Sequence, residues 1–277
     1  MTIQTASREI GLAPAPSHYP ENSFRVLGST TLLQTKRLLT RWGRDYVTVI
    51  EALLFPIMFL LVLKIVLGSL IYAMTHDNAM YSLVPLLALG GAVSGSTFVA
   101  IDLMRERTSG LLSRLWVLPV HRASGMLARV LADAVRILIT TIVILGAGVA
   151  MGFRFRQGLL PTLMWFSVPV ILGVAFAIGV TTVALYAGQV LAVEIVEVGQ
   201  ALLIFFSTGM LPLDQYPKWI QPVVEHQPVS YAVAAMRGLS TGGPVLVPYL
   251  AMLGWTAFMC VTNAVPLAIG YKRASTH

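Results

Sequence analysis

Side chains that could carry out catalysis are few and scattered in this sequence. The five histidines all fall outside the long apolar stretches: His18, His76, His121, His226 and His277. Ser94 and Ser96, which do lie in such a stretch, therefore have no histidine at the same depth to act as a general base. Neither HExxH nor GxxxxGK[ST] occurs. We therefore expect no catalytic residue, no metal site, no bound cofactor and no ATP hydrolysis by this chain itself.

Carboxylates in or near apolar stretches need partners. Asp102 can reach Arg105, three residues further on, and Asp133 stands between Arg129 and Arg136. On a helix these spacings place opposite charges side by side. They predict internal ion pairs close to one membrane surface.

Glu194 and Glu197 share a helical face and have no basic residue nearby in the sequence. Two interpretations stay open. The carboxylates line a polar substrate pathway between subunits, or water simply wets them at the start of a helix. Phe205 and Phe206, further along the same stretch, could close such a pathway on the outer side.

Five arginines lie between residues 105 and 129. A helix in this segment would place Leu111, Leu115 and Leu118 on one side, next to Trp116, and would end at Pro119. Held between two apolar stretches, such an amphipathic helix suits a groove on a cytoplasmic partner.

The composition of the chain indicates whether water or lipid surrounds it. Hydrophobic residues make up 56% of the 277-residue chain and charged residues 11%, with a mean hydropathy of +0.78. Soluble domains carry about 25% charged residues, so a lipid bilayer is the expected surrounding. The single cysteine, Cys260, permits no disulfide within the chain.

We expect an all-α polytopic membrane protein with six transmembrane helices, because a crossing takes about 20 apolar residues. The stretches are 47–72, 81–104, 124–151, 159–187, 193–211 and 246–270, within a transmembrane domain over residues 47–270. Gly91 with Gly95, and Gly148 with Gly152, have the GxxxG spacing that lets helices approach closely.

The segments outside the transmembrane domain differ in character. Residues 1–28 lack the apolar core of a signal peptide and read as a flexible cytoplasmic tail, as do residues 271–277. Residues 29–46 carry Arg37, Arg41 and Trp42, which are typical of an amphipathic helix in the membrane interface.

The distribution of lysine and arginine orients the chain. With a cytoplasmic N-terminus, thirteen of the nineteen basic residues fall on the inner side and four on the outer side, and Lys64 and Arg136 fall within stretches. By the positive-inside rule both termini are expected in the cytoplasm. Residues 211–243 are then external, and Pro222 and Pro228 divide them into two short re-entrant or interfacial helices.

These features resemble the membrane subunits of ABC-2 type exporters. The loop matches the family's Glu-Arg-x-x-Gly … Leu-x-x-x-Pro-x-x-Arg pattern at Glu106, Arg107, Gly110, Leu115, Pro119 and Arg122. The outer signature matches at Pro228, Tyr231 and Arg237. Gln227 and Val229 stand where Asn and Leu are expected. The resemblance implies that the loop, with Leu111 and Trp116, forms a coupling helix that contacts a separate ATPase.

More narrowly, segments such as "GSTFVAIDLMRER" and "HQPVSYAVAAMRG" resemble daunorubicin-resistance-type permeases of mycobacteria. That resemblance implies a plasma-membrane exporter of a large hydrophobic lipid, phthiocerol dimycocerosate, or of an amphiphilic drug. It also implies two copies of an ATPase that bind ATP and Mg, and a second permease in a heterodimer with a DrrB-like chain. The residues alone leave a homodimer open.

Other functions remain as alternatives. A secondary transporter would need an internal repeat and midplane carboxylates, a membrane enzyme would need a catalytic constellation, and a channel would need a polar pore-lining stripe. The sequence lacks these features, and no nucleic-acid partner is expected.

Overall fold

The computed structural model describes residues 24–75, 78–108, 124–187 and 190–276, and these contain helices and no strand. The α-helices are α2 (Phe24–Arg44), α3 (Tyr46–Thr75), α4 (Met80–Thr108), α6 (Ser124–Ala150), α7 (Leu159–Ala187), α8 (Val190–Phe205), α9 (Gln221–His226), α10 (Pro228–Thr241) and α11 (Leu246–Thr276), with a 3₁₀ turn η1 at Leu213–Gln215. The predicted all-helical fold is confirmed. Residues 1–23, the N-terminal part of the expected tail, lie outside the described residues.

Five of these helices are long and apolar enough to cross a bilayer: α3, α4, α6, α7 and α11. The sixth expected crossing, α8, has only 16 residues. At 1.5 Å per residue it is about 24 Å long, which is shorter than the roughly 30 Å of a hydrocarbon core. The boundary predicted for this stretch, 193–211, is wrong at its C-terminal end, because the helix stops at Phe205.

Hydrogen bonds to main-chain carbonyls explain why α8 ends early. The Tyr216 hydroxyl lies 3.3 Å from the carbonyl oxygen of Phe205 and 3.1 Å from that of Ser207, and the Gln227 amide donates to the carbonyl of Phe206. These side chains bind the carbonyls of Phe205 and Phe206, which have no helical partner at the C-terminus of α8. Such partners lie too far along the chain to be evident from an apolar stretch.

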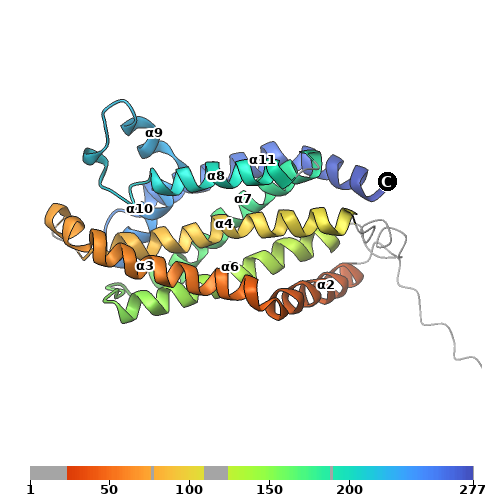
Figure 1. Ribbon diagram of the computed structural model, residues 1–277, viewed down its shortest axis with the longest axis horizontal. Coiled ribbons are helices and arrows are strands. Elements are labelled where there is room, and N and C mark those ends of the chain that lie inside the picture. The colour runs from red at the N-terminus through yellow and green to blue at the C-terminus, as the bar shows by residue number, and fades with distance from the viewer. Residues whose placement is uncertain (1–23, 76–77, 109–123, 188–189, 277) are drawn as a thin grey trace, which may run out of the picture.

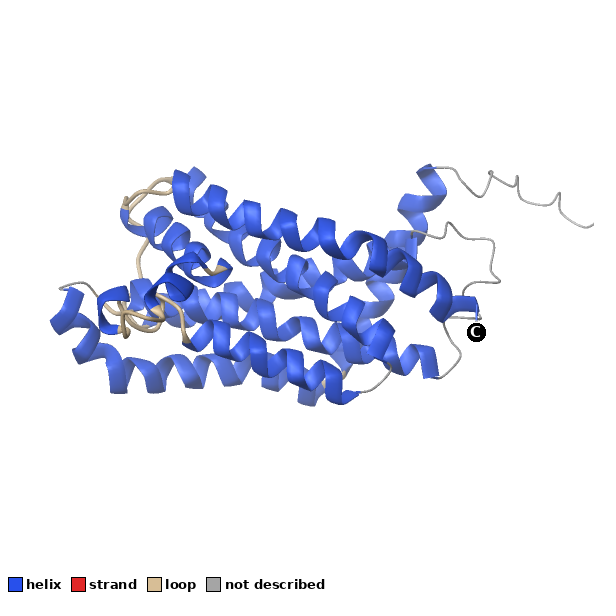
Figure 2. Ribbon diagram, turned by 90° about the horizontal axis from the view of Figure 1, so that it is seen from above, coloured by secondary structure: helices blue, strands red, loops and turns tan. Residues whose placement is uncertain are grey.

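The bundle has two distinct ends (Figure 1). One end carries α2 and the C-terminus of α11, and the other carries α9 and α10. The helices α3, α4, α6, α7, α8 and α11 run between these ends, so that both ends of the described chain lie on the same side. Figure 2 shows the same separation from above. We call the end with α2 the inner end and the end with α9 the outer end.

The helices α4 and α7 form the centre of the bundle, and close packing there depends on small residues. A Cβ added to Gly173 would lie 2.6 Å from Ile137 Cδ1 and 3.0 Å from Ala92 Cβ. One added to Gly148 would lie 2.5 Å from Val84 Cγ2. The expectation that Gly148 permits close helix contact is therefore confirmed, since a larger residue would push α6 away from α4.

The short break between α2 and α3 is made by Asp45. Its carboxylate accepts hydrogen bonds from the Thr48 hydroxyl at 2.8 Å and from the Thr48 amide at 3.3 Å. These bonds cap the N-terminus of α3 and hold the pKa of Asp45 below its ordinary value of 3.8. The cap fixes where the inner-end helix α2 meets the first crossing.

Candidate functional site

Charged side chains from three helices meet at the inner end in what we call the inner charge cluster: Arg37, Arg41, Asp102, Glu106 and Arg129. The Glu106 side chain is only 3% exposed. It pairs with Arg129 of α6, with Arg37 Nη2 at 3.4 Å and with Arg41 Nη1 at 3.6 Å. Arg41 also lies 3.5 Å from Asp102. The cluster therefore joins α2, α4 and α6 through one buried carboxylate.

A second contact holds α2 against α6. The Thr35 hydroxyl lies 2.8 Å from the carbonyl of Thr31 and 3.3 Å from that of Ala128, one residue before Arg129. The position of α2 on α6 is thus set beside the ion pairs.

The partners within the cluster differ from those that sequence spacing predicted. Asp102 pairs with Arg41, and Arg129 pairs with Glu106 rather than Asp133. The Asp133–Arg136 pair follows the expected spacing. The reason is geometric: α2 folds back onto α4 and α6, and its arginines reach carboxylates some sixty residues away in the sequence.

The loop that the sequence singled out lies mainly outside the described residues. Residues 109–123 include Gly110, Leu111, Leu115, Trp116, Pro119 and Arg122. Arg107 is in the last turn of α4, which ends at Thr108. The described flanks are nevertheless informative, because the Glu106–Arg129 ion pair joins the stretch before this segment to the stretch after it.

The three interfacial-helix residues lie on α2, at or next to the inner charge cluster. Arg37 and Arg41 are members of it, and Trp42 is half-buried. Arg41, Trp42 and Asp45 line one side of a polar chamber of about 1130 Å³, much of it open to the surroundings. Its opposite wall includes Arg129 and Asp133 of α6. We call this space the polar chamber.

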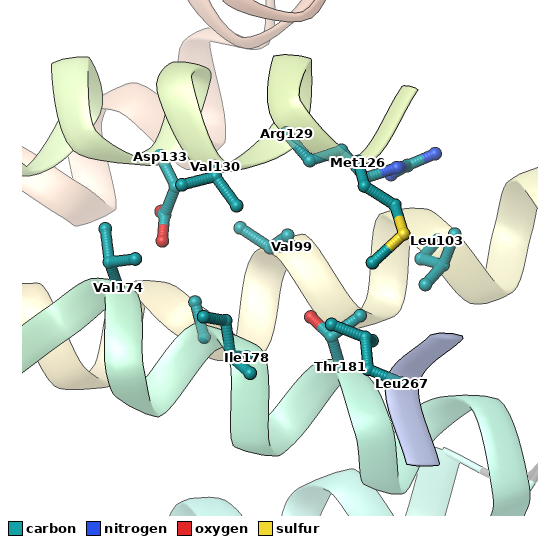
Figure 3. A pocket seen from close by; sticks show the side chains of 11 residues that line it. Val99, Leu103, Met126, Arg129, Val130, Asp133, Val174, Ile178, Thr181 and Leu267 are labelled. Atoms are coloured by element: carbon teal, nitrogen blue, oxygen red, sulfur yellow. The ribbon is translucent and has the colours of Figure 1, made fainter. Parts of the chain in front are cut away.

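An apolar recess adjoins the polar chamber and shares part of its lining. It lies among α4, α6, α7 and α11 and has an empty volume of about 450 Å³, part of which is open to the surroundings. Figure 3 shows its side chains spread along the helices, with Asp133 and Val174 towards one end and Leu103 and Leu267 towards the other. Val99, Arg129 and Asp133 line both spaces.

Glu194 and Glu197 are exposed on α8, and Phe205 and Phe206 are exposed at the last residue of this helix and just beyond it. The Phe205 ring meets Phe59 of α3 edge-on, with centroids 6.4 Å apart. The Phe206 ring lies 6.5 Å from Tyr216. The structure thus places Glu194 in the inner half of α8 and Glu197 at its middle, with the two phenylalanines at the outer end.

The outer signature forms the core of the outer end. Pro228 begins α10, where its missing N–H costs no helical hydrogen bond, and Tyr231 and Arg237 follow on that helix. Most of α10 is buried, packed among α4, α7 and α11. The predicted division of this segment into two short helices is confirmed, with the break at Gln227.

Gln227 shows why that break is stable although Asn was expected there. Its amide donates to the carbonyl of Phe206 and lies 3.1 Å from Ser230 Oγ. Ser230 Oγ in turn accepts a hydrogen bond from the Thr208 amide at 3.2 Å. Nearby, burial raises the pKa of the Tyr216 hydroxyl above its ordinary value.

Sequence reasoning missed a buried polar contact between α4 and α8. Gln200 Nε2 donates to Ser96 Oγ at 3.2 Å, and Ser96 Oγ donates to the carbonyl of Val93 at 2.6 Å. Ser96 therefore packs helices together. Within the described ranges, no group of three His, Cys, Asp or Glu side chains could hold a metal ion.

The fold and composition define an integral membrane protein, and comparison with known proteins identifies the family. Residues 29–240 match the model of the ABC-2 type transporter family, and the chain belongs to that family.

Two relatives illustrate the range of sequence identity. The chain is 66% identical, over 275 residues, to a protein of Mycobacterium tuberculosis named as a probable doxorubicin resistance ABC transporter permease, DrrC. The match covers 99% of this chain and all of the relative. It is 24% identical over 219 residues to a daunorubicin resistance ABC transporter permease, DrrB1, of Streptomyces coeruleorubidus, covering 77% and 76% of the two chains.

Proposed function

We propose that this protein is the membrane-spanning subunit of an ATP-driven exporter that moves large hydrophobic lipids or amphiphilic drugs from the inner leaflet outward. Its family membership and apolar helices support a transport role. The names of its relatives, which refer to resistance to doxorubicin and daunorubicin, support export of an amphiphilic molecule. ATP and Mg bind to a separate ATPase subunit, present in two copies.

The observation that carries this proposal is the burial of Glu106 between Arg129 and the arginines of α2. The segment between α4 and α6 is the coupling segment, and this cluster ties its two flanks together. Movement of the segment by an ATPase would then displace α2, α4 and α6 as a unit. Paired, buried charges suit this role because separating them is costly.

The proposed substrate route follows from the free energy that it costs to expose a hydrocarbon chain to water. Burial of each methylene is worth about 0.8 kcal/mol, so a waxy lipid such as phthiocerol dimycocerosate favours a path that stays beside lipid. It enters sideways from the inner leaflet, passes Glu194 and Glu197, and leaves past Phe205 and Phe206 at the outer end.

A second permease completes this route. An apolar strip on α8, Ile195, Val198 and Leu202, is 64%, 60% and 51% exposed. The strip has helical spacing and suits a partner helix, either in a heterodimer with a DrrB-like chain or in a homodimer. Cysteines at positions 201–209 should crosslink to that partner in the assembled complex.

Both termini are placed in the cytoplasm by the positive-inside rule. Tags at residues 213–218 should react with an impermeant reagent added outside cells, and tags at the C-terminus should not. The reverse pattern would overturn the orientation and, with it, the assignment of the coupling segment.

The deciding experiment reconstitutes the chain with its ATPase and second permease and measures ATP-dependent export of doxorubicin and of a radiolabelled wax lipid. Trp116→Asp should abolish export while the complex still inserts, because the substitution buries a charge against the ATPase. Trp219→Asp is the matched control, since Trp219 is 79% exposed at the outer end. Normal export by the Trp116 variant would contradict the coupling role.

A further inference from the structure

The apolar recess among α4, α6, α7 and α11 lies inside one subunit and is separate from the proposed route along α8. Most of its lining residues are apolar, with Val99, Val174, Ile178 and Leu267 among them. A carboxylate in such a place needs an explanation. Figure 3 shows the side chain of Asp133 extending from α6 toward α7 at one end of this recess.

Asp133 is satisfied on one oxygen only. Its side chain is 1% exposed, and Oδ1 accepts a hydrogen bond from Arg136. Oδ2 is buried and has no hydrogen-bond partner among the described residues. Buried polar atoms are nearly always paired, so this acceptor points to a hydrogen-bond donor that binds in the recess.

The surrounding charges indicate what kind of donor fits. Arg136 already neutralises Asp133, and Arg129 brings a second guanidinium to the lining, itself paired with Glu106. A cationic ligand would meet two positive side chains and no unpaired negative one. An uncharged donor meets no such repulsion and supplies the missing hydrogen bond.

We propose that the recess binds an alkyl chain bearing a hydroxyl group, with the hydroxyl donating to Oδ2 of Asp133. The chain lies along the helices toward Leu103 and Leu267, as the elongated lining allows. The recess adjoins the polar chamber at Val99, Arg129 and Asp133, and we place the entry of the ligand there. Binding of the alcohol does not depend on the proposed export function; only the role of the bound alcohol in transport rests on that function.

A photoreactive probe tests the site directly in the purified full complex. A long-chain alcohol carrying a diazirine is compared with its methyl ether, which has the same chain and no donor. The alcohol should label peptides containing Met126 or Thr181, which line the recess, about tenfold more efficiently, since a bond to a charged acceptor is worth that factor. Equal labelling by the two probes would overturn the proposal.

A variant that fills the recess provides an independent test and leaves the Asp133–Arg136 ion pair intact. Val174→Phe should reduce alcohol labelling at these peptides about tenfold or more, because the ring occupies the recess. Val265→Phe is the matched control, because Val265 is 66% exposed on α11 and should leave labelling unchanged. Unchanged labelling in an assembled Val174 variant would place the ligand elsewhere.

Asp133→Asn makes the sharpest chemical test. Arg136 can only donate, so the asparagine oxygen should turn to it and leave an NH₂ group facing the recess. The preference should then invert, with the ether labelling at least as well as the alcohol. A retained preference for the alcohol would exclude Asp133 as the acceptor.

Addition of ATP distinguishes two sources of the alcohol. If the site holds cargo, turnover should lower the labelling; if it holds a resident membrane lipid, labelling should stay constant. Labelling of the recess in a complex that exports nothing would support the binding site and refute the proposed function. The two proposals can therefore be refuted separately.

Discussion

The two ends of the bundle are held by different chemistry. At the inner end, Glu106 joins three helices through arginines, and every link is an ion pair. At the outer end, Tyr216 and Gln227 donate to main-chain carbonyls, and both the donors and the acceptors are uncharged. The difference matches the task of each end.

The carbonyls left unpaired at the C-terminus of α8 are satisfied there by neutral donors, which place no charge beside this helix end. In the proposed function, the inner end holds separate helices together beside the coupling segment. Charges serve there because one buried carboxylate can accept from several arginines at once.

Removal of the inner carboxylate should have the largest effect. Glu106→Gln leaves Arg129 buried without a counter-charge, which should cost about 3–5 kcal/mol in unfolding free energy. Thermal unfolding in detergent measures the loss, and hydrogen exchange should show α2 detaching. Glu51→Gln, at an exposed position of α3, is the control; equal effects of the two substitutions would refute the role of the cluster.

Loss of the Gln227 side-chain amide at the outer end should cause the second-largest loss of stability. Gln227→Leu leaves the carbonyl of Phe206 without its donor, at a cost of about 1–3 kcal/mol. The same unfolding assay applies, with increased exchange expected at the end of α8 and not in α2. Gln215→Leu, at an exposed residue, should be nearly neutral. A change confined to the inner end would contradict the independence of the two ends.

The cap of α10 should matter less. Gly242 has φ of +97°, and its amide donates to the carbonyl of Gly238. Gly242→Ala should cost roughly 1–2 kcal/mol, because an L side chain is strained there. Gly243 does not have a positive φ, so Gly243→Ala should have little effect. If both variants unfold alike, backbone strain is not the cause.

The smallest effect should come from Asp45 at the junction of α2 and α3. Its folded-state pKa lies below 3.8, so the stabilisation is present above that value and is lost as the pH falls through the folded pKa. Hydrogen exchange of the Thr48 amide should therefore accelerate only in strong acid. Asp45→Asn should remove that dependence. Acceleration that begins near neutral pH would show that another group caps α3.

Much of this architecture could be predicted from the order of residues, but the pairing of charges could not. The apolar stretches predicted the helices, and Pro222 and Pro228 predicted a divided outer segment. The partners of Glu106 could not be predicted, because Arg37 and Arg41 reach it only after α2 packs on α6. Charges that stand near one another in a sequence are candidates for pairing, yet folding also brings distant ones within reach.

Sequence alone determined that the protein lies in a lipid bilayer, and it determined the length of most helices. The reason is that the transfer of side chains and main-chain groups into lipid depends on local composition. Only the tertiary structure decided where α8 ends, which carboxylate joins three helices, and which oxygen of Asp133 lacks a donor. Each of these depends on atoms from segments far apart in the chain, and hydrogen bonds and ion pairs act only over a few ångströms.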